Sequence, residues 1–290
     1  MSALLGIEAT AGLNASLLGL NFVNISAGTY EVGDGDFDNP LRQVTLDAFN
    51  LADTPTTNKQ FAKGLKQLRG RTTVLMTELA DHRWAILARG TEREVRKIEE
   101  KRLSAIIAKS GLEQQSFSRI GERFVSGALR TFNFGRQTKI VPVTLEAHLP
   151  ARFRGPNQPA LASPFEAYAF AALFGLALPI GVQWEAAAAD LKDEKYRRKE
   201  KLRRVAHFYP ARATANVGTR EPNKFGLYDM LGDVWEVMAN RYKEGRKARE
   251  LRGGSWRFNI GGVRVALRDK ARPRDWSGDV GFRLLRPSTP

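Results

Sequence analysis

The 290-residue chain lacks cysteine altogether and has only three histidines. The absence of cysteine excludes a disulfide framework, a thiolate metal site and a thiol nucleophile. No apolar run approaches the roughly 20 residues of a membrane-spanning helix. The first residues include Glu8 and no basic stretch, so we expect no secretory signal. The location stays open between the cytoplasm and a phage or other particle.

Acidic residues are in deficit, since 46 Lys and Arg face 31 Asp and Glu and give a net charge of +15. The excess is concentrated near the C-terminus, where residues 241–286 hold 14 basic and 5 acidic residues. Two explanations fit this excess of basic residues. Either the residues serve solubility and internal arginine contacts, or the protein binds an acidic partner. Its length allows one large domain or two modest ones, and a hydrophobic content of 42% is enough for a core.

The N-terminal and central parts carry short strand and helix signals. Apolar residues alternate with polar ones in three short segments between residues 21 and 50, which predicts strands of a half-buried sheet. Thr57 followed by Gln60 predicts the capped start of a helix. Ser163 and Glu166, with a proline between them, predict another helix start. A further helix is expected from about residue 183.

Residues 66–141 differ from their surroundings in being highly charged. Thr91 and Glu94 form a capping box, and apolar residues then recur with a helical period. The first stripe is Val95, Ile98, Arg102 and Ile106, ending near Gly111, and the second is Phe117, Ile120, Phe124 and Ala128. We therefore expect a helical insertion between two parts of one domain, residues 1–65 and 142–290. It is either inert decoration or an adaptor that docks the protein onto a partner.

The C-terminal segment, residues 251–286, alternates residues typical of a rigid frame with residues that share no property. The frame contains glycines for unusual backbone angles, an aromatic anchor and arginines that can bond several carbonyls. These frame residues are Arg252, Gly253, Gly254, Ser255, Trp256, Arg264, Gly281, Phe282 and Arg283. The residues between these frame positions differ widely in size, charge and polarity. Such a mixture does not suit a core, so it predicts ligand-facing loops on a fixed support.

The segment PNKFGLYDMLGDVWE at residues 222–236 resembles the formylglycine-generating enzyme (sulfatase-modifying factor) family. Further similar segments follow in the same order along most of the chain. They are residues 25–30, 44–49, 57–61, 165–168, 178–179 and 183–188, and then the C-terminal frame. The resemblance implies an α+β, C-type-lectin-like fold with sparse secondary structure, to which the helical insertion is added.

The catalytic chemistry of that family does not follow from the resemblance. Its oxidase members activate oxygen at copper through a cysteine pair, which this chain lacks, and related sulfoxide synthases hold iron by histidines. Here His82, His148 and His207 are scattered along the sequence. We therefore expect no enzyme, and fold alone does not carry function. The alternative is a metal-dependent oxidase or sulfoxide synthase of the superfamily with atypical ligands.

The C-terminal frame resembles the variable proteins of diversity-generating retroelements, in which selected loop positions are hypervariable on a lectin-like support. The resemblance implies ligand binding, here to an unknown macromolecule that we expect to be a protein. We do not expect nucleic acid, because the sequence has no recognisable nucleic-acid-binding motif. Phe258 and Trp276 are the expected anchors, with a core position as the alternative for each. The candidate ligand-binding residues are Arg257, Phe258, Asn259, Ile260, Asp269, Ala271, Arg274, Asp275, Trp276, Ser277 and Asp279.

Asp233 and Glu236 occupy the positions at which the family's enzymes have, in a similar segment, oxygen ligands for calcium. Carboxylates suit a hard cation. In the other interpretation, Glu236 accepts hydrogen bonds from neighbouring amides or from an arginine. We expect no cofactor apart from this calcium ion, which stays open. Arg252, Arg264 and Arg283 are expected to bond backbone carbonyls inside the protein rather than a ligand.

Overall fold

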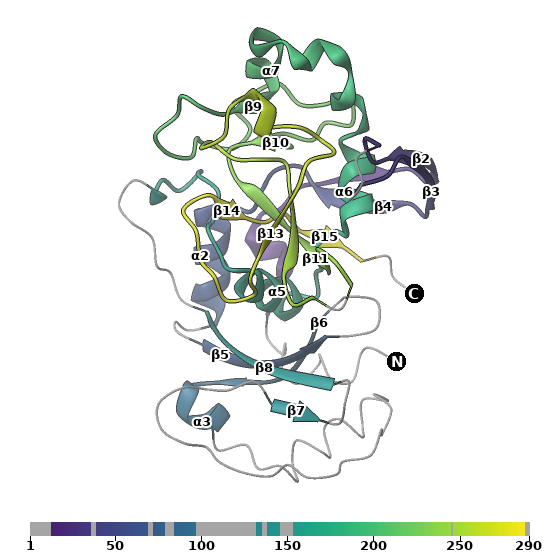
Figure 1. Ribbon diagram of the computed structural model, residues 1–290. Coiled ribbons are helices and arrows are strands. Elements are labelled where there is room, and N and C mark those ends of the chain that lie inside the picture. The colour runs from purple at the N-terminus through teal and green to yellow at the C-terminus, as the bar shows by residue number, and fades with distance from the viewer. Residues whose placement is uncertain are drawn as a thin grey trace.

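The computed structural model describes residues 13–35, 39–68, 72–78, 84–96, 132–134, 138–145, 153–244 and 246–287. The chain forms short helices and several small sheets, as expected for an α+β fold with sparse secondary structure (Figure 1). Within the described residues, no helix is both long and apolar enough to cross a membrane.

The N-terminal part supplies four strands and one capped helix. The elements are η1 (Ala15–Leu18), β1 (Phe22–Ile25), β2 (Gly28–Val32), β3 (Arg42–Leu46), β4 (Phe49–Ala52) and α2 (Asn58–Gln67). Strands β1, β2 and β3 and the helix start lie where the sequence predicts them, whereas β4 was not predicted. The Thr57 amide donates to the Gln60 side chain at 2.8 Å, and the Gln60 amide donates back to the Thr57 hydroxyl at 3.2 Å.

The segment expected to be helical forms mainly a sheet where it is described. Its elements are β5 (Thr72–Glu78), β6 (Trp84–Gly90), α3 (Glu92–Arg96), β7 (Phe132–Phe134) and β8 (Thr138–Leu145). The strand order is β6-β5-β8-β7. The helical expectation is therefore wrong for these strands, in which β-branched Thr, Val and Ile residues favour the extended backbone. The capping box of Thr91 and Glu94 is present and starts α3.

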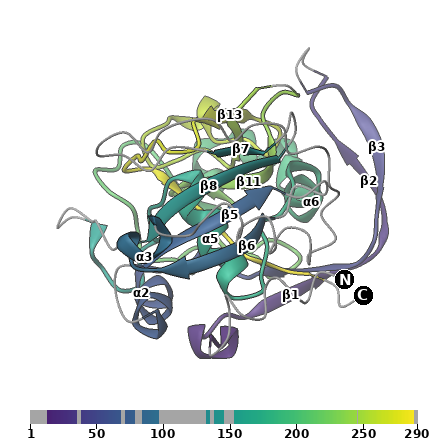
Figure 2. The same ribbon diagram turned by 90° about the horizontal axis from the view of Figure 1, so that it is seen from below.

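The rest of the expected hairpin lies outside the described residues. This applies to Ile98, Arg102, Ile106, Gly111, Phe117, Ile120, Phe124 and Ala128. Figure 2 looks onto the four-stranded sheet, with α5 (Pro164–Leu173) behind it, and α5 packs against β6 and β8. Buried Val74, Met76, Ile86 and Leu145 belong to the same hydrophobic cluster as α5. The described strands of this segment thus find their apolar partner within the chain.

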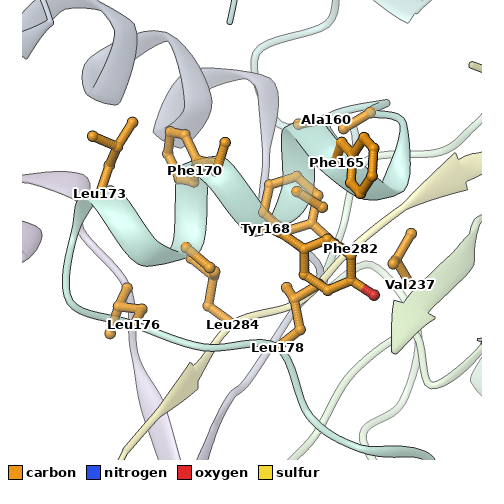
Figure 3. Packing of buried hydrophobic residues seen from close by; sticks show 14 of the residues in the cluster. Ala160, Phe165, Tyr168, Phe170, Leu173, Leu176, Leu178, Val237, Phe282 and Leu284 are labelled. Atoms are coloured by element: carbon orange, nitrogen blue, oxygen red, sulfur yellow. The ribbon is translucent and has the colours of Figure 1, made fainter. Parts of the chain in front are cut away.

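The helix α5 lies at the centre of the main core. Its N-cap Ser163 and Glu166 form the predicted capping box. Phe170 stacks on Phe61 with ring centroids 4.7 Å apart and meets Phe282 edge-on at 5.9 Å. Figure 3 shows Phe170 and Phe282 among the side chains that gather around α5. The C-terminal frame is thereby anchored in the core through Phe282.

A second part of the core forms around the next helices. The elements are α6 (Gly181–Ala187), η3 (Ala189–Lys192), η4 (Glu194–Arg197), α7 (Lys199–Val205) and β9 (Ala206–His207). Trp184 of α6 is fully buried there, together with Leu202 and Val205 of α7. The charged residues of η4 and α7 lie mostly on the exposed side, as expected for a solvated face.

The C-terminal part forms the remaining strands and long connecting loops. Its elements are β10 (Leu231–Gly232), β11 (Trp235–Arg241), β12 (Arg249–Arg252), η5 (Ile260–Gly262), β13 (Arg268–Ala271), β14 (Val280–Gly281) and β15 (Leu285–Arg286). One sheet has the order β13-β12-β11-β14, and β15 pairs with β4. The last strand therefore ties the C-terminal frame to the N-terminal strands, and the loops between β12 and β14 are left to form a surface.

Candidate functional site

Two consecutive glycines begin the loop after β12. Gly253 and Gly254 have φ angles of 93° and 77°, a region that side chains with a Cβ rarely adopt. A Cβ on Gly254 would lie 2.3 Å from the carbonyl oxygen of Gly262. Trp256 follows, is buried, and donates its indole N–H to the carbonyl of Gly278 at 3.0 Å. These contacts hold the start of the loop after β12 against the backbone at Gly262 and Gly278.

Arg283, one of the frame residues, forms a buried ion pair with Glu236. Arg283 donates from Nε to Glu236 Oε2 and from Nη2 to Glu236 Oε1, each at 2.7 Å. Trp184 donates its indole N–H to the same Oε2 at 2.8 Å. The remaining guanidinium hydrogens reach the carbonyls of Ala52 and Tyr228. Arg283 therefore has the internal, carbonyl-bonding role that the sequence predicts.

Arg252, at the end of β12, also bonds carboxylates and carbonyls inside the protein. Its guanidinium forms buried ion pairs with Glu185 at 3.0 Å and with Glu250 at 2.5 Å. It also donates to the carbonyls of Val265 and Ala266 at 3.4 and 3.2 Å. Because buried charges must be paired, these contacts fix the frame independently of the loop side chains.

The loop that follows Trp256 presents three exposed side chains, those of Arg257, Phe258 and Asn259. Phe258 is 36% exposed, and its ring also meets buried Trp235 edge-on at 5.5 Å. Its carbonyl accepts from the amide of Tyr209 at 2.9 Å. Tyr209 is 56% exposed and adds a second aromatic ring beside this loop. No sequence pattern predicts a role for Tyr209, because its contact with Phe258 joins two distant parts of the chain.

The second exposed segment is residues 274–276. Trp276 is 43% exposed, so it does not occupy the core position that was its alternative. Arg274 and Asp275 are also exposed, whereas Ser277 is half-buried. The Arg274 guanidinium lies 5.5 Å from the ring centre of Phe165, and burial lowers its pKa. This segment thus presents an aromatic ring next to two charged residues.

A contact between Arg257 and Asp279 links the loop after Trp256 to the chain just beyond the second exposed segment. Arg257 Nε lies 3.8 Å from a carboxylate oxygen of Asp279. Asp279 itself is buried and accepts hydrogen bonds from the hydroxyls of Ser255 and Ser277. The expectation that Asp279 faces a ligand is therefore wrong, because its carboxylate joins the two ends of the frame.

The other three candidates are half-buried and belong to regular elements. Asp269 and Ala271 lie in β13, which pairs with β12 at an edge of its sheet. Ile260 starts η5 and packs against the core cluster around Trp184. The exposed candidates are therefore Arg257, Phe258, Asn259, Arg274, Asp275 and Trp276. We call these six residues, together with Tyr209, the loop surface.

The two carboxylates considered for calcium are engaged differently. Both oxygens of Glu236 accept from Arg283, so Glu236 has the arginine partner of the other interpretation and does not fit a calcium ion. Asp233 is buried in a left-handed conformation, with φ 55°, and one oxygen accepts from the Ala215 amide at 2.8 Å. Its other oxygen has no hydrogen-bond partner among the described residues.

The buried carboxyl groups of this region have altered proton affinity. Burial raises the pKa of Asp233 well above its ordinary value, and the nearby charge of Asp229 raises it further. Burial also raises the pKa of Asp229. Within the described part of the chain, no three His, Asp or Glu side chains are grouped as metal ligands. His207 bonds the carbonyl of Ala213 at 3.0 Å, and His82 and His148 lie outside the described residues.

The sequence of this chain is similar to a known domain family and to proteins of two mammals. The family model described as "Sulfatase-modifying factor enzyme 1-like domain" matches residues 14–288. The Bos taurus protein named "Inactive C-alpha-formylglycine-generating enzyme 2" is 27% identical over 278 residues, covering 91% of this chain and 87% of that protein. A Mus musculus protein of the same name is 26% identical over 275 residues, covering 90% and 84%.

Two solved structures share the fold over most of their length. Treponema denticola variable protein 1 has a TM-score of 0.57 and 17% identity, and the match covers 92% of this chain and 95% of that one. PvdO from Pseudomonas aeruginosa has a TM-score of 0.58 and 19% identity, with coverages of 91% and 93%. At these identities the likeness concerns the fold alone.

Proposed function

The chain belongs to the sulfatase-modifying factor enzyme 1-like domain family, and from this premise we propose that it is a non-catalytic binding protein. The loop surface recognises a macromolecular target, which we expect to be a protein. The proposal rests on one observation: exposed aromatic and arginine side chains lie on loops whose ends are fixed by buried contacts. Aromatic residues and arginine dominate the binding energy of most protein interfaces.

The separation of frame and surface supports this function. Phe282, Arg283, Arg252 and Trp256 are buried and hold the backbone, while Phe258 and Trp276 are substantially exposed. A change at an exposed side chain then alters what the protein binds more than whether it folds. That property is what a surface adapted to different targets requires.

The absence of catalysis is supported by the chain's own residues. It has no cysteine for the family's copper chemistry, and the carboxylate of Glu236 is held by Arg283. Two relatives carry the word "inactive" in their names. These observations favour binding over the alternative of a metal-dependent oxidase or sulfoxide synthase.

Diversification by a retroelement is the finer part of the proposal. The C-terminal frame motif and the fold shared with a Treponema denticola variable protein support it. In such systems adenine positions of the gene are altered, mostly in asparagine codons. Lys270 and Trp276 cannot arise from AAC or AAT by changes at adenine, so they are fixed or descend from another codon. A near-repeat of the gene's 3′ end that differs at adenines, beside a reverse transcriptase gene, tests this part.

The binding function is tested by removing the two exposed rings. The double variant Phe258→Ala, Trp276→Ala should lose capture of the protein's target from its native cells, with a melting temperature close to that of the wild type. The matched control is Leu17→Ala, Leu41→Ala, which removes two exposed apolar side chains elsewhere. Equal target capture by both double variants contradicts the proposed surface, and a large loss of stability would identify the rings as core.

A further inference from the structure

A pocket with a volume of about 730 Å³ lies next to the loop surface but outside it. Residues 260–261 and 263–266 form one wall, and residues between Leu191 and Leu202 contribute another. Gly33 and Asp34, at the end of β2, also line it. Sites for small molecules commonly have volumes of roughly 300–1,000 Å³. The volume of the pocket therefore suits a small ligand rather than a protein partner.

The floor of this pocket is apolar. It is made by buried side chains that belong to the core cluster around Trp184, namely Leu191, Leu202, Leu231, Val263 and Val265. These residues come from η3, α7, β10 and the loop after η5, so the core itself fixes the shape of the floor. A ligand can therefore contact this floor without any rearrangement of the protein, which lowers the entropic cost of binding.

Two exposed arginines stand at the rim of the pocket. The side chain of Arg264 is 51% exposed, and its Nη1 is 4.0 Å from Asp34 Oδ2, which is the outer limit of an ion pair. The side chain of Arg197 is 78% exposed and pairs at 3.3 Å with Glu194. Ion pairs between exposed groups contribute little to stability, so an incoming anion displaces them at little cost. Arg264 Nε donates to the carbonyl of Gly261 at 3.1 Å, as the sequence predicts, but its two terminal nitrogens make no comparably short contact among the described residues. These nitrogens and the Arg197 guanidinium are thus available to a ligand.

The other charged groups of the lining are already engaged. Lys192 lies 2.8 Å from Glu185 and donates to the carbonyls of Glu31 and Gly33. Asp193 accepts from the amide of Lys195 at 2.8 Å. The surrounding segment, residues 190–204, holds 8 Lys and Arg against 4 Asp and Glu, an excess of 4 positive charges. The rim therefore favours a negatively charged ligand.

We infer that this pocket binds a small organic anion with an apolar body. The carboxylate or sulfonate of such a ligand pairs with Arg264 at the rim, and Arg197 adds to the positive field. The apolar body covers the leucine and valine floor. The inference does not rest on the proposed function, because neither Phe258 nor Trp276 lines the pocket.

The test uses 1-anilinonaphthalene-8-sulfonate as the probe, with the purified full chain. We expect saturable binding of one probe per chain, followed by fluorescence and by calorimetry, and competition by dodecanoate. Arg264→Glu should weaken the affinity by about tenfold or more, because it reverses the charge beside the sulfonate. The matched control Arg246→Glu, at an exposed arginine that does not line the pocket, should leave the affinity unchanged.

A neutral probe separates the charge from the apolar floor. N-phenyl-1-naphthylamine lacks the sulfonate, so its weaker binding should be the same in the wild type and in Arg264→Glu. Where Arg264→Glu lowers the melting temperature, Arg197→Glu provides the same comparison at a more exposed side chain. Equal sulfonate affinity for the rim variants and the control, or binding that does not saturate at one site, overturns the inference.

The two proposals fail separately. The double variant Phe258→Ala, Trp276→Ala should keep the wild-type affinity for the sulfonate probe, since both residues lie outside the lining. Loss of probe binding in that variant would contradict a separate pocket. Absence of target capture with normal probe binding would count against the loop surface alone.

Discussion

Arg283 and Glu236 form a two-point ion pair in which both side chains are almost completely shielded from solvent. The pair joins β11 to the chain end that leads into β15, and it also receives the indole of Trp184. A buried charge that loses its partner is strongly destabilising. The geometry of the frame therefore depends on this contact more than on any loop side chain.

Replacing one member of the pair should lower stability sharply. For Glu236→Gln we expect a loss of about 3–5 kcal/mol in the free energy of unfolding, because Arg283 keeps its charge without a carboxylate. Urea unfolding followed by circular dichroism measures this loss. The control Glu221→Gln removes an exposed carboxylate, 2.6 Å from Arg204, and should cost about 1 kcal/mol or less. Similar losses in both variants would contradict the buried pair.

Gly254, at the start of the loop after β12, should not accept a side chain. Gly254→Ala places a Cβ 2.3 Å from the carbonyl oxygen of Gly262, in addition to the strain at positive φ. Gly226→Ala has a φ of 87° but no atom within 4 Å of the added Cβ, so its cost should be the backbone strain of about 1–2 kcal/mol. Thermal unfolding of both variants gives the comparison. Equal losses would show that the close approach is relieved without cost.

The buried Asp233 should make stability depend on pH. Its folded-state pKa is raised above that of the unfolded chain, mainly by burial. Its contribution to stability is thus fully present below the unfolded pKa and is lost as the pH rises through the folded pKa. Asp233→Asn removes this titration. The stability of the variant relative to the wild type should therefore increase as the pH rises, which denaturant titrations between acidic and neutral pH measure.

An exposed aspartate provides the opposite sign as a control. The backbone hydrogen bond from Lys195 lowers the pKa of Asp193. Its contribution is present above the unfolded pKa and is lost as the pH falls through the folded pKa. The stability of Asp193→Asn relative to the wild type should therefore decrease as the pH rises. If the stability difference between Asp233→Asn and the wild type did not change with pH, the Asp233 carboxyl would titrate in the folded protein as it does in the unfolded chain.

Metal should not be part of the folded protein. Elemental analysis of the purified chain is expected to show no stoichiometric copper or iron, because the chain has no cysteine and the described residues group no metal ligands. Stoichiometric copper or iron would restore the alternative of a metal-dependent enzyme.

Calcium is tested through stability in the same preparation. Since Arg283 occupies both oxygens of Glu236, added calcium should not raise the melting temperature, and a chelator should not lower it. A ligand that binds the native state alone must raise stability. A rise with calcium would therefore revive the site at Asp233.

The frame residues could be predicted from local sequence alone. Gly253 and Gly254 indicated unusual backbone angles, Trp256 an anchor, and Arg252 and Arg283 internal carbonyl partners. Each of these predictions depends on what a residue type does locally, so neighbouring sequence is enough to make it. The capping boxes that start α2, α3 and α5 were predictable for the same reason, because donor and acceptor lie three residues apart.

Contacts between side chains from distant segments could be seen only in the folded structure. It buried Asp279 between two serines, placed Tyr209 beside Phe258, and gave Glu236 to Arg283. It also turned part of the charged insertion into a sheet that packs on α5. These outcomes depend on contacts between residues far apart in sequence, and the burial of a polar group is settled by the partner that the fold brings to it.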